Sequence, residues 1–197
     1  MELKKFHKIV LASASPRRLE LLRQIGIEPE VKVSHVEEKV TSCVPGDVVM
    51  ELASQKAMDV AKGEKSGTLV IGSDTVVAVD GRILGKPKDH EEAMEMIERI
   101  QGRAHQVYTG VCMVLCGMSD AERRVVTFFD ETDVEVYPMS REEIITYAMS
   151  EEPMDKAGAY AVQGLFGRYI KGLKGSYANV MGLPISMLYQ EMKKLYD

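Results

Sequence analysis

The sequence has few cysteines, no long apolar run and no excess of basic residues. Its three cysteines, Cys43, Cys112 and Cys116, form no CxxC pair, which argues against a disulfide framework or a zinc site and favours buried, reduced thiols. The apolar runs are too short to span a bilayer or to form the core of a signal peptide. We therefore expect a cytoplasmic protein without a membrane partner.

The bulk composition is that of an ordinary globular protein. Of the 197 residues, 45% are hydrophobic and 28% are charged, so we predict a single domain over residues 1–197 with a substantial core. The formal net charge of −5 argues against a broad basic surface, and we expect no stable nucleic-acid partner. A small anionic substrate needs only a few local cations in a cleft, so it remains compatible with this charge.

Hydrophobic periodicity predicts a mixture of strands and helices. We expect strands over 8–12, 27–33, 69–79, 104–115 and 124–136, and helices over 16–24, 47–62, 89–100, after Ser140 and after Pro184. Asp80-Gly81 is a strong hairpin signal at the end of the third strand. Because strands and helices do not alternate strictly, the predicted fold class is α/β or mixed α+β, with a mixed sheet.

The sequence also indicates where helices begin and which of their residues face the core. We expect Asp47 to cap the second helix, and Asp89 with Glu92 to form a capping box for the third. The residues expected to face inward are Leu19 and Leu22 in the first helix, and Ala93, Met96, Ile97 and Ile100 in the third. The glycine-rich segment from Gly158 to Gly182 is too apolar for a linker and is predicted to be ordered.

The segment from Ser13 to Arg18 lies between a predicted strand and a predicted helix. Pro16 at the first helical position and Ser15 as the cap leave backbone N–H groups free to bind an anion. The guanidinium groups of Arg17 and Arg18 match phosphate oxygens, so a triphosphate is a natural ligand. The alternative is an ordinary capped helix with two solvated arginines.

Asp74 interrupts an otherwise apolar strand. Burial of a carboxylate is costly unless it is hydrogen-bonded, metal-bound or exposed in a cleft, which makes Asp74 the best candidate for a catalytic carboxylate. The alternative, an edge-strand aspartate facing water, is disfavoured because Val70, Ile71, Val76 and Val77 suggest burial on both faces of the strand.

Other charged and polar residues complete a possible site for phosphate chemistry. Glu37 and Glu38, Lys56 and Lys86 are individually weak signals, since charged pairs usually form a solvated face. Together with Asp74 they offer carboxylates for a hard cation and ammonium groups for phosphates. Gln163, in the late glycine-rich segment, could recognise the edge of a base through its amide, or belong to a purely structural loop.

Several motifs resemble those of the Maf family over nearly the whole chain. They are SASPRR, GSDT, GKPKD, GRAHQVYTGV, EPMDKAGAYAVQG and GSYANVMGLP, which occur in the family's order. The resemblance implies a fold similar to that of the inosine triphosphate pyrophosphatases, with two lobes around a central cleft, and a homodimer. It also implies hydrolysis of a nucleoside triphosphate to the monophosphate and pyrophosphate with Mg²⁺, Mn²⁺ or Co²⁺.

The same resemblance implies roles for individual residues. Asp74 would be the general base, and Glu38 with Asp74 would hold the metal, although Glu37-Glu38 stands where the family often has Asp-Glu. Residues that would bind the substrate are Ser13, Arg17, Arg18, Lys56, Thr75, Lys86 and Gln163.

At the family's specificity positions the sequence has Arg17, Thr75 and Gln163. In this it resembles the branch of the family that acts on dTTP and UTP. Two other readings are a nucleotide-binding regulator of septum formation and a pyrophosphatase for non-standard purines.

Overall fold

The computed structural model describes residues 6–195, which contain one seven-stranded sheet. The strands are β1 (Lys8–Leu11), β2 (Glu30–Val31), β3 (Thr68–Val79), β4 (Arg82–Leu84), β5 (Ala104–Leu115), β6 (Arg124–Val136) and β7 (Ile170–Lys174). Their order is β2-β1-β3-β5-β6-β7, and β4 pairs with β3 outside this path. The expected mixed α/β class is confirmed.

Helices and short 3₁₀ turns connect the strands. The α-helices are α1 (Pro16–Gln24), α2 (Pro45–Ala61), α3 (His90–Ile100), α4 (Arg141–Ala148), α5 (Tyr177–Met181) and α6 (Ile185–Lys194). The 3₁₀ turns are η2 (Asp120–Glu122), η3 (Glu152–Asp155), η4 (Ala157–Ala159) and η5 (Leu165–Tyr169). No helix within residues 6–195 is long and apolar enough to cross a membrane.

The chain divides into two compact units. Unit 1 contains the described residues up to Asp74, Thr109–Asp130, and the described residues from Gly182 onward. Unit 2 contains Thr75–Tyr108 and Glu131–Met181. The boundary falls inside β3, β5 and β6, so each of these strands runs through both units.

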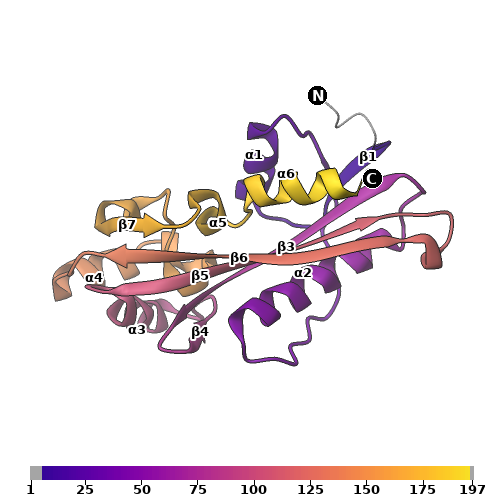
Figure 1. The fold of residues 1–197 in the computed structure, drawn as a ribbon. Coiled ribbons are helices and arrows are strands. Elements are labelled where there is room, and N and C mark those ends of the chain that lie inside the picture. Colours follow the sequence, from indigo (N-terminus) through magenta and orange to yellow (C-terminus); the bar gives the residue numbers. More distant parts are fainter. Residues whose placement is uncertain (1–5, 196–197) are drawn as a thin grey trace. The chain divides into compact units, whose positions relative to one another are not determined.

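In unit 1, β1 lies between β2 and β3 and is parallel to both. Helix α2 covers one face of these strands, and α1 and α6 lie on the other face (Figure 1). The face under α2 is lined by small side chains, with Ala53, Ala57 and Ala61 of the helix packed against Val10 and Val70 of the strands. Small residues on both surfaces allow the helix to approach the sheet closely.

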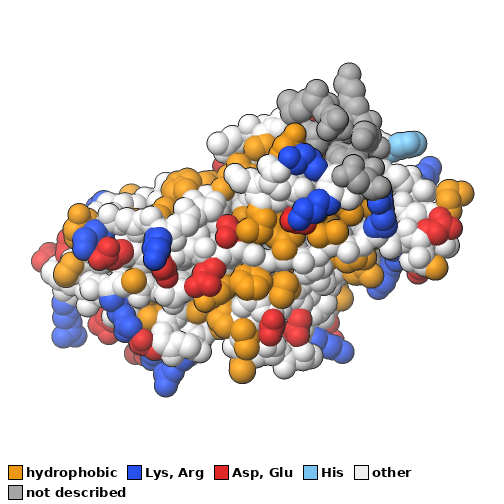
Figure 2. Space-filling model, in the orientation of Figure 1, with side chains coloured by type: hydrophobic (Ala, Val, Ile, Leu, Met, Phe, Trp, Pro, Cys, Tyr) orange, Lys and Arg blue, Asp and Glu red, His pale blue; other side chains and the backbone are white. Residues whose placement is uncertain are grey.

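In unit 2, β6 and β7 pair antiparallel, and α3 and α4 lie on one side of β5 and β6 (Figure 1). The core includes an aromatic cluster in which Phe166 contacts Tyr147, Tyr160 and Tyr169. On the visible face of this unit, Figure 2 shows acidic and basic side chains interspersed. One ion pair of unit 2 joins Lys171 to Glu135 at 2.7 Å.

Most predicted elements are confirmed. Strands β5 and β6 have the expected bounds, α1 spans 16–24, and the Asp80-Gly81 turn joins the antiparallel strands β3 and β4. All four residues expected on the inner face of α3 are buried. The glycine-rich segment is ordered, since it forms η4, η5, β7 and α5.

Three local predictions are wrong. The strand expected over 27–33 is reduced to Glu30–Val31 because Pro29 lacks an N–H group for the ladder. Helix α2 begins at Pro45, a residue favoured at the first helical position, so its cap is Val44 and Asp47 lies in the first turn. Cys43 is exposed, although Cys112 and Cys116 are buried as expected.

Two expectations about helix side chains also need correction. The buried residues of α1 are Leu21 and Leu22, while Leu19 is only half-buried, because the inner face is rotated. In α3, the Asp89 carboxylate accepts from the backbone N–H of Glu92, as a cap should. The Glu92 side chain, however, accepts from Lys88 N–H, so the predicted reciprocal capping box is only half formed.

His105, on β5, is fully buried in unit 2, and its Nε2 lies 2.7 Å from the Tyr160 hydroxyl. Burial, reinforced by the positive charge of Arg103, lowers the pKa of His105 from 6.5 to about 4. The folded protein therefore holds this imidazole neutral at pH values where the unfolded chain would protonate it.

We predict that the free energy of unfolding falls as the pH decreases from 6.5 to about 4, by up to ~3 kcal/mol from this residue. The free energy of unfolding falls because, in this pH interval, the unfolded state binds a proton at His105 that the folded state does not bind. Urea unfolding across the interval should show a shallower pH dependence in His105→Gln than in the parent chain. His35→Gln, which changes an exposed histidine, is the control. Equal slopes for the parent and His105→Gln would contradict the prediction.

Candidate active site

The loop between β1 and α1 places Ser13 and Arg18 in one hydrogen-bond network. The Ser13 hydroxyl accepts from Arg18 Nη1 at 2.9 Å and from the backbone N–H of Ser15 at 3.2 Å. Arg18 Nε donates to the carbonyl of Gly182 at 2.9 Å. Burial lowers the pKa of Arg18, and the negative charges of Asp74 and Glu38 oppose that shift. A guanidinium group keeps its charge at neutral pH in proteins.

The start of α1 has the features expected of an anion site. Ser15 is the cap residue and Pro16 follows it, but the Ser15 side chain makes no capping hydrogen bond. The first N–H groups of this turn have no partner within the helix and carry its positive dipole end. Arg17 lies half-buried in the same turn, and its charge adds to the lowering of the Arg18 pKa, so the two guanidinium groups are close.

A second group of predicted residues meets at β3 and α2. Lys56 Nζ, from α2, contacts Asp74 Oδ1, from β3, and lies 3.0 Å from Glu38 Oε1. The Lys56 and Asp74 side chains are each 17% exposed. Two carboxylates thus converge on one ammonium group. Of the two neighbouring glutamates, it is Glu38 whose carboxylate shares the Lys56 ammonium group with Asp74.

Backbone packing explains why Lys56 meets Asp74. A Cβ atom on Gly72 would lie 2.4 Å from the Ala53 carbonyl oxygen and 2.8 Å from the Ala57 nitrogen, so the backbone of α2 rests directly on β3. Side chains two residues apart on a strand share a face. Asp74 therefore points to the face on which α2 carries Lys56.

The loop that carries Glu38 is attached to the same helix. Gln55 donates from Nε2 to the Lys39 carbonyl at 2.6 Å and accepts from the Lys39 N–H at 2.9 Å. Glu51 accepts from both the backbone and the hydroxyl of Thr41, which lowers the pKa of Glu51. These bonds fix the residues that follow Glu38, and so limit where its carboxylate can lie.

Sequence reasoning missed the roles of Ser73 and Gly182. The buried Ser73 hydroxyl donates to the Gly182 carbonyl at 3.0 Å, and the same oxygen accepts from Arg18. Gly182 has a φ of 113°, which favours glycine, and it stands just before α6. A carbonyl acceptor has no residue signature, so only the glycine and the neighbouring motif could have pointed to it.

The remaining predicted residues belong to unit 2. Thr75 follows Asp74 on β3, and strand alternation turns its side chain to the opposite face. Lys86 is exposed after β4, where the Gly85 carbonyl accepts from Gly158 N–H at 2.9 Å. Gln163 is exposed in a turn of the late loop. That these residues act on the same ligand as Asp74 stays a prediction.

The carboxylates suit a hard cation that has other oxygen ligands. Within residues 6–195, no three His, Cys, Asp or Glu side chains form a group that could hold a metal by themselves. Glu38 and Asp74 nevertheless converge on a single cationic group. Mg²⁺ is commonly held by one or two carboxylates together with substrate phosphates, so this pair fits such an ion when phosphate oxygens are supplied.

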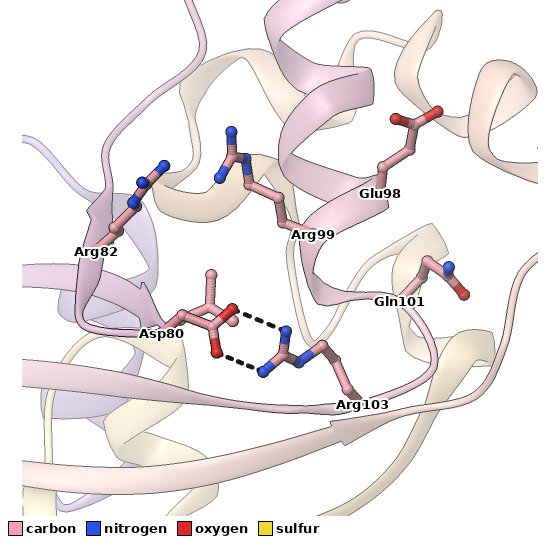
Figure 3. A pocket seen from close by; sticks show the side chains of 7 residues that line it. Asp80, Arg82, Glu98, Arg99, Gln101 and Arg103 are labelled. Carbon is pink, nitrogen blue, oxygen red and sulfur yellow. Dashed lines mark hydrogen bonds and ion pairs between the residues drawn. The ribbon is translucent and has the colours of Figure 1, made fainter.

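A separate pocket of about 520 Å³ lies in unit 2 and is lined by none of the predicted site residues. Arg103 donates to both carboxylate oxygens of Asp80, at 2.9 and 2.6 Å (Figure 3). Asp80 has a φ of 51° and Gly81 a φ of 72°, as a tight hairpin turn requires. We interpret this pair as a structural link between the hairpin and the start of β5.

Comparisons with known proteins agree over almost the full length. The family profile described as Maf-like protein matches residues 8–195. The chain is 49% identical over 189 residues to a dTTP/UTP pyrophosphatase of Lachnoclostridium phytofermentans and 44% identical over 188 residues to one of Bacillus cereus strain B4264. Each alignment covers 95% of both chains.

A solved structure of the Staphylococcus aureus Ham1 protein is also similar. It shares 18% identity with this chain at a TM-score of 0.44, and the alignment covers 82% of this chain and 93% of that one.

We predict that Gly72→Ala destabilises the protein by roughly 1–3 kcal/mol, because its Cβ would overlap the backbone of α2. Thermal unfolding should show a midpoint several degrees lower than that of the parent. Gly172→Ala is the matched control, since an added Cβ there meets nothing within 4 Å. Equal midpoints for the two variants would refute the close packing of α2 on β3.

Proposed function

The chain belongs to the Maf family, and from this premise we propose that it hydrolyses dTTP and UTP to the monophosphate and pyrophosphate. The observation that carries the proposal is the contact of Lys56 with both Asp74 and Glu38, beside the arginine-bearing start of α1. Relatives at 44–49% identity that are named dTTP/UTP pyrophosphatases support the choice of substrate.

The cations would hold the triphosphate. Arg17 and Arg18 offer planar guanidinium groups, and the first turn of α1 offers backbone N–H donors beside them. Ser13 holds Arg18 in place and would bind substrate from the same loop. Lys56 and Lys86 would contribute ammonium groups. Because Arg18 is also bonded to Gly182, its guanidinium is already oriented before substrate arrives.

Asp74 would act as the general base. Its carboxylate would accept a proton from a water molecule as the water oxygen attacks the α-phosphorus, and the bond from that phosphorus to the oxygen that bridges to the β-phosphoryl group would break. Pyrophosphate then leaves with the electron pair of that bond. The placement of Asp74 on β3, under the backbone of α2, gives this base a fixed position.

A divalent cation, Mg²⁺, Mn²⁺ or Co²⁺, would be held by Glu38 and Asp74 and, when bound, would neutralise phosphate charge and acidify the attacking water. Lys56 is the cation that the two carboxylates hold in this structure. The same ammonium group would remain near the substrate and bind a phosphate oxygen.

A homodimer, as the family resemblance implies, is part of the proposal.

The base would be selected by Arg17, Thr75 and Gln163. Uracil and thymine present O2, N3–H and O4, and a side-chain amide can donate and accept on such an edge. Gln163 is exposed in its turn and therefore accessible to a ligand. Cytosine has a different pattern of donors and acceptors on its edge. It would leave polar groups of the site without hydrogen-bond partners, and the site would therefore reject it.

We expect Asp74→Asn to lower turnover of dTTP and UTP by ~10²- to 10⁴-fold while nucleotide binding persists, because the amide cannot accept the proton from water. Pyrophosphate release and nucleotide titration would be measured on the same preparation. Asp120→Asn is the control, because that carboxylate is 86% exposed in η2. Turnover by Asp74→Asn at the parent rate would remove Asp74 from the mechanism.

Gln163→Glu should reduce kcat/KM for dTTP and UTP by about 10-fold or more, because a carboxylate loses the amide donor. Gln24→Glu makes the same chemical change at an exposed position in α1 and should leave the kinetics unchanged. If both variants match the parent, Gln163 does not recognise the base.

A further inference from the structure

The turn that carries Gln163 is anchored at its start by the buried residues Ala161 and Val162. Gly164 N–H donates to the Ala161 carbonyl at 3.1 Å, which closes the turn around Val162 and Gln163. The Gln163 side chain is exposed. The position of the other end of the turn depends on what holds the residues that follow Gln163.

Glu152 holds those residues. One carboxylate oxygen accepts from Leu165 N–H at 2.7 Å, and the other accepts from Phe166 N–H at 3.1 Å. These are the first two N–H groups of η5, whose cap residue is Gly164 and has no side chain. Glu152 therefore caps η5 from 13 residues upstream of Leu165 through charge-assisted hydrogen bonds.

The carboxylate is itself fixed by α4. Tyr147 donates from its hydroxyl to Glu152 Oε1 at 3.0 Å, and its ring packs against Phe166 with centroids 5.0 Å apart. Burial chiefly, together with the negative charge of Glu152, raises the pKa of Tyr147, so the hydroxyl remains a donor. Glu152 is thus held on one side by a buried phenol and on the other by the backbone.

Gly164 leaves room for this arrangement. A Cβ atom there would lie 2.2 Å from Glu152 Oε2 and 2.5 Å from its carboxyl carbon. The residue directly after Gln163 therefore lies against the carboxylate without an intervening side chain. Any shift of Glu152 is transmitted to the Gln163 turn through one residue.

We propose that Glu152 is a positioning residue that sets the conformation of the Gln163 turn and thereby the enzyme's preference among bases. The proposal rests on the proposed function, in which Gln163 recognises a pyrimidine. Glu152 need not touch the substrate. Its effect should appear in KM and in base preference more than in kcat, whereas a merely structural cap would change only stability.

Two variants test the proposal. Glu152→Gln keeps the size but has only one acceptor oxygen for three donors, so at least one bond is lost. Leu165→Pro removes the shortest of these donors while proline suits the first position of η5, so it is expected to fold even if Glu152→Gln does not. Glu151→Gln is the control, because Glu151 is exposed and directly adjacent.

For each variant we would measure kcat and KM with dTTP and CTP, and for Glu152→Gln and Glu151→Gln also amide hydrogen exchange of Leu165 and Phe166. Glu152→Gln and Leu165→Pro should raise KM for dTTP by about 10-fold, with kcat within about 2-fold, and reduce the preference for dTTP over CTP. Exchange at both amides should be faster in Glu152→Gln than in Glu151→Gln.

Gln163→Ala separates the possible failures. If Gln163→Ala loses the preference for dTTP while Glu152→Gln and Leu165→Pro retain it, the role of Glu152 is overturned and the proposed function stands. If Gln163→Ala itself retains the preference, recognition of the base by Gln163 is wrong, and the inference about Glu152 is overturned with it.

Discussion

The direct contact between the backbone of α2 and β3 at Gly72 is the constraint on which the site in unit 1 depends. Gly110 on β5 makes a similar contact, since a Cβ there would lie 2.3 Å from the Val49 carbonyl oxygen. Where helix and sheet approach this closely, Lys56 has little freedom and meets Asp74 on the shared face. The same helix binds the loop that carries Glu38. The arrangement of β3, α2 and this loop therefore depends on the packing of α2 against the sheet.

The packing brings together charged groups of both signs. Arg17, Arg18 and Lys56 outnumber the carboxylates of Glu38 and Asp74, so the group has a positive balance that an anionic substrate would complement. The carboxylates also stabilise the charge of Arg18 against burial. A carboxylate pair beside phosphate-binding cations would repel a triphosphate unless a metal intervened, which is why the proposed mechanism combines both kinds of group.

The long, strongly periodic segments could be predicted from the sequence, and so could the residues that meet around Asp74. Strands β5 and β6 follow from their length and composition, and Asp74 stands out because it interrupts an apolar strand. Contacts through backbone atoms could not be predicted: the Gly182 carbonyl that joins Ser73 to Arg18 has no residue signature. The distant cap formed by Glu152 depends on tertiary structure, which periodicity does not encode.

The proposed activity is metal-dependent hydrolysis of pyrimidine triphosphates. Pyrophosphate release should be measured with dTTP, UTP, CTP, GTP, ATP and 7-methyl-GTP, each with Mg²⁺ or Mn²⁺ and with a chelator. We expect turnover mainly of dTTP and UTP, and we expect the chelator to abolish it. Absence of turnover with every triphosphate would contradict the proposed activity and favour a nucleotide-binding regulator, and a preference for purine triphosphates would contradict the proposed recognition of the base.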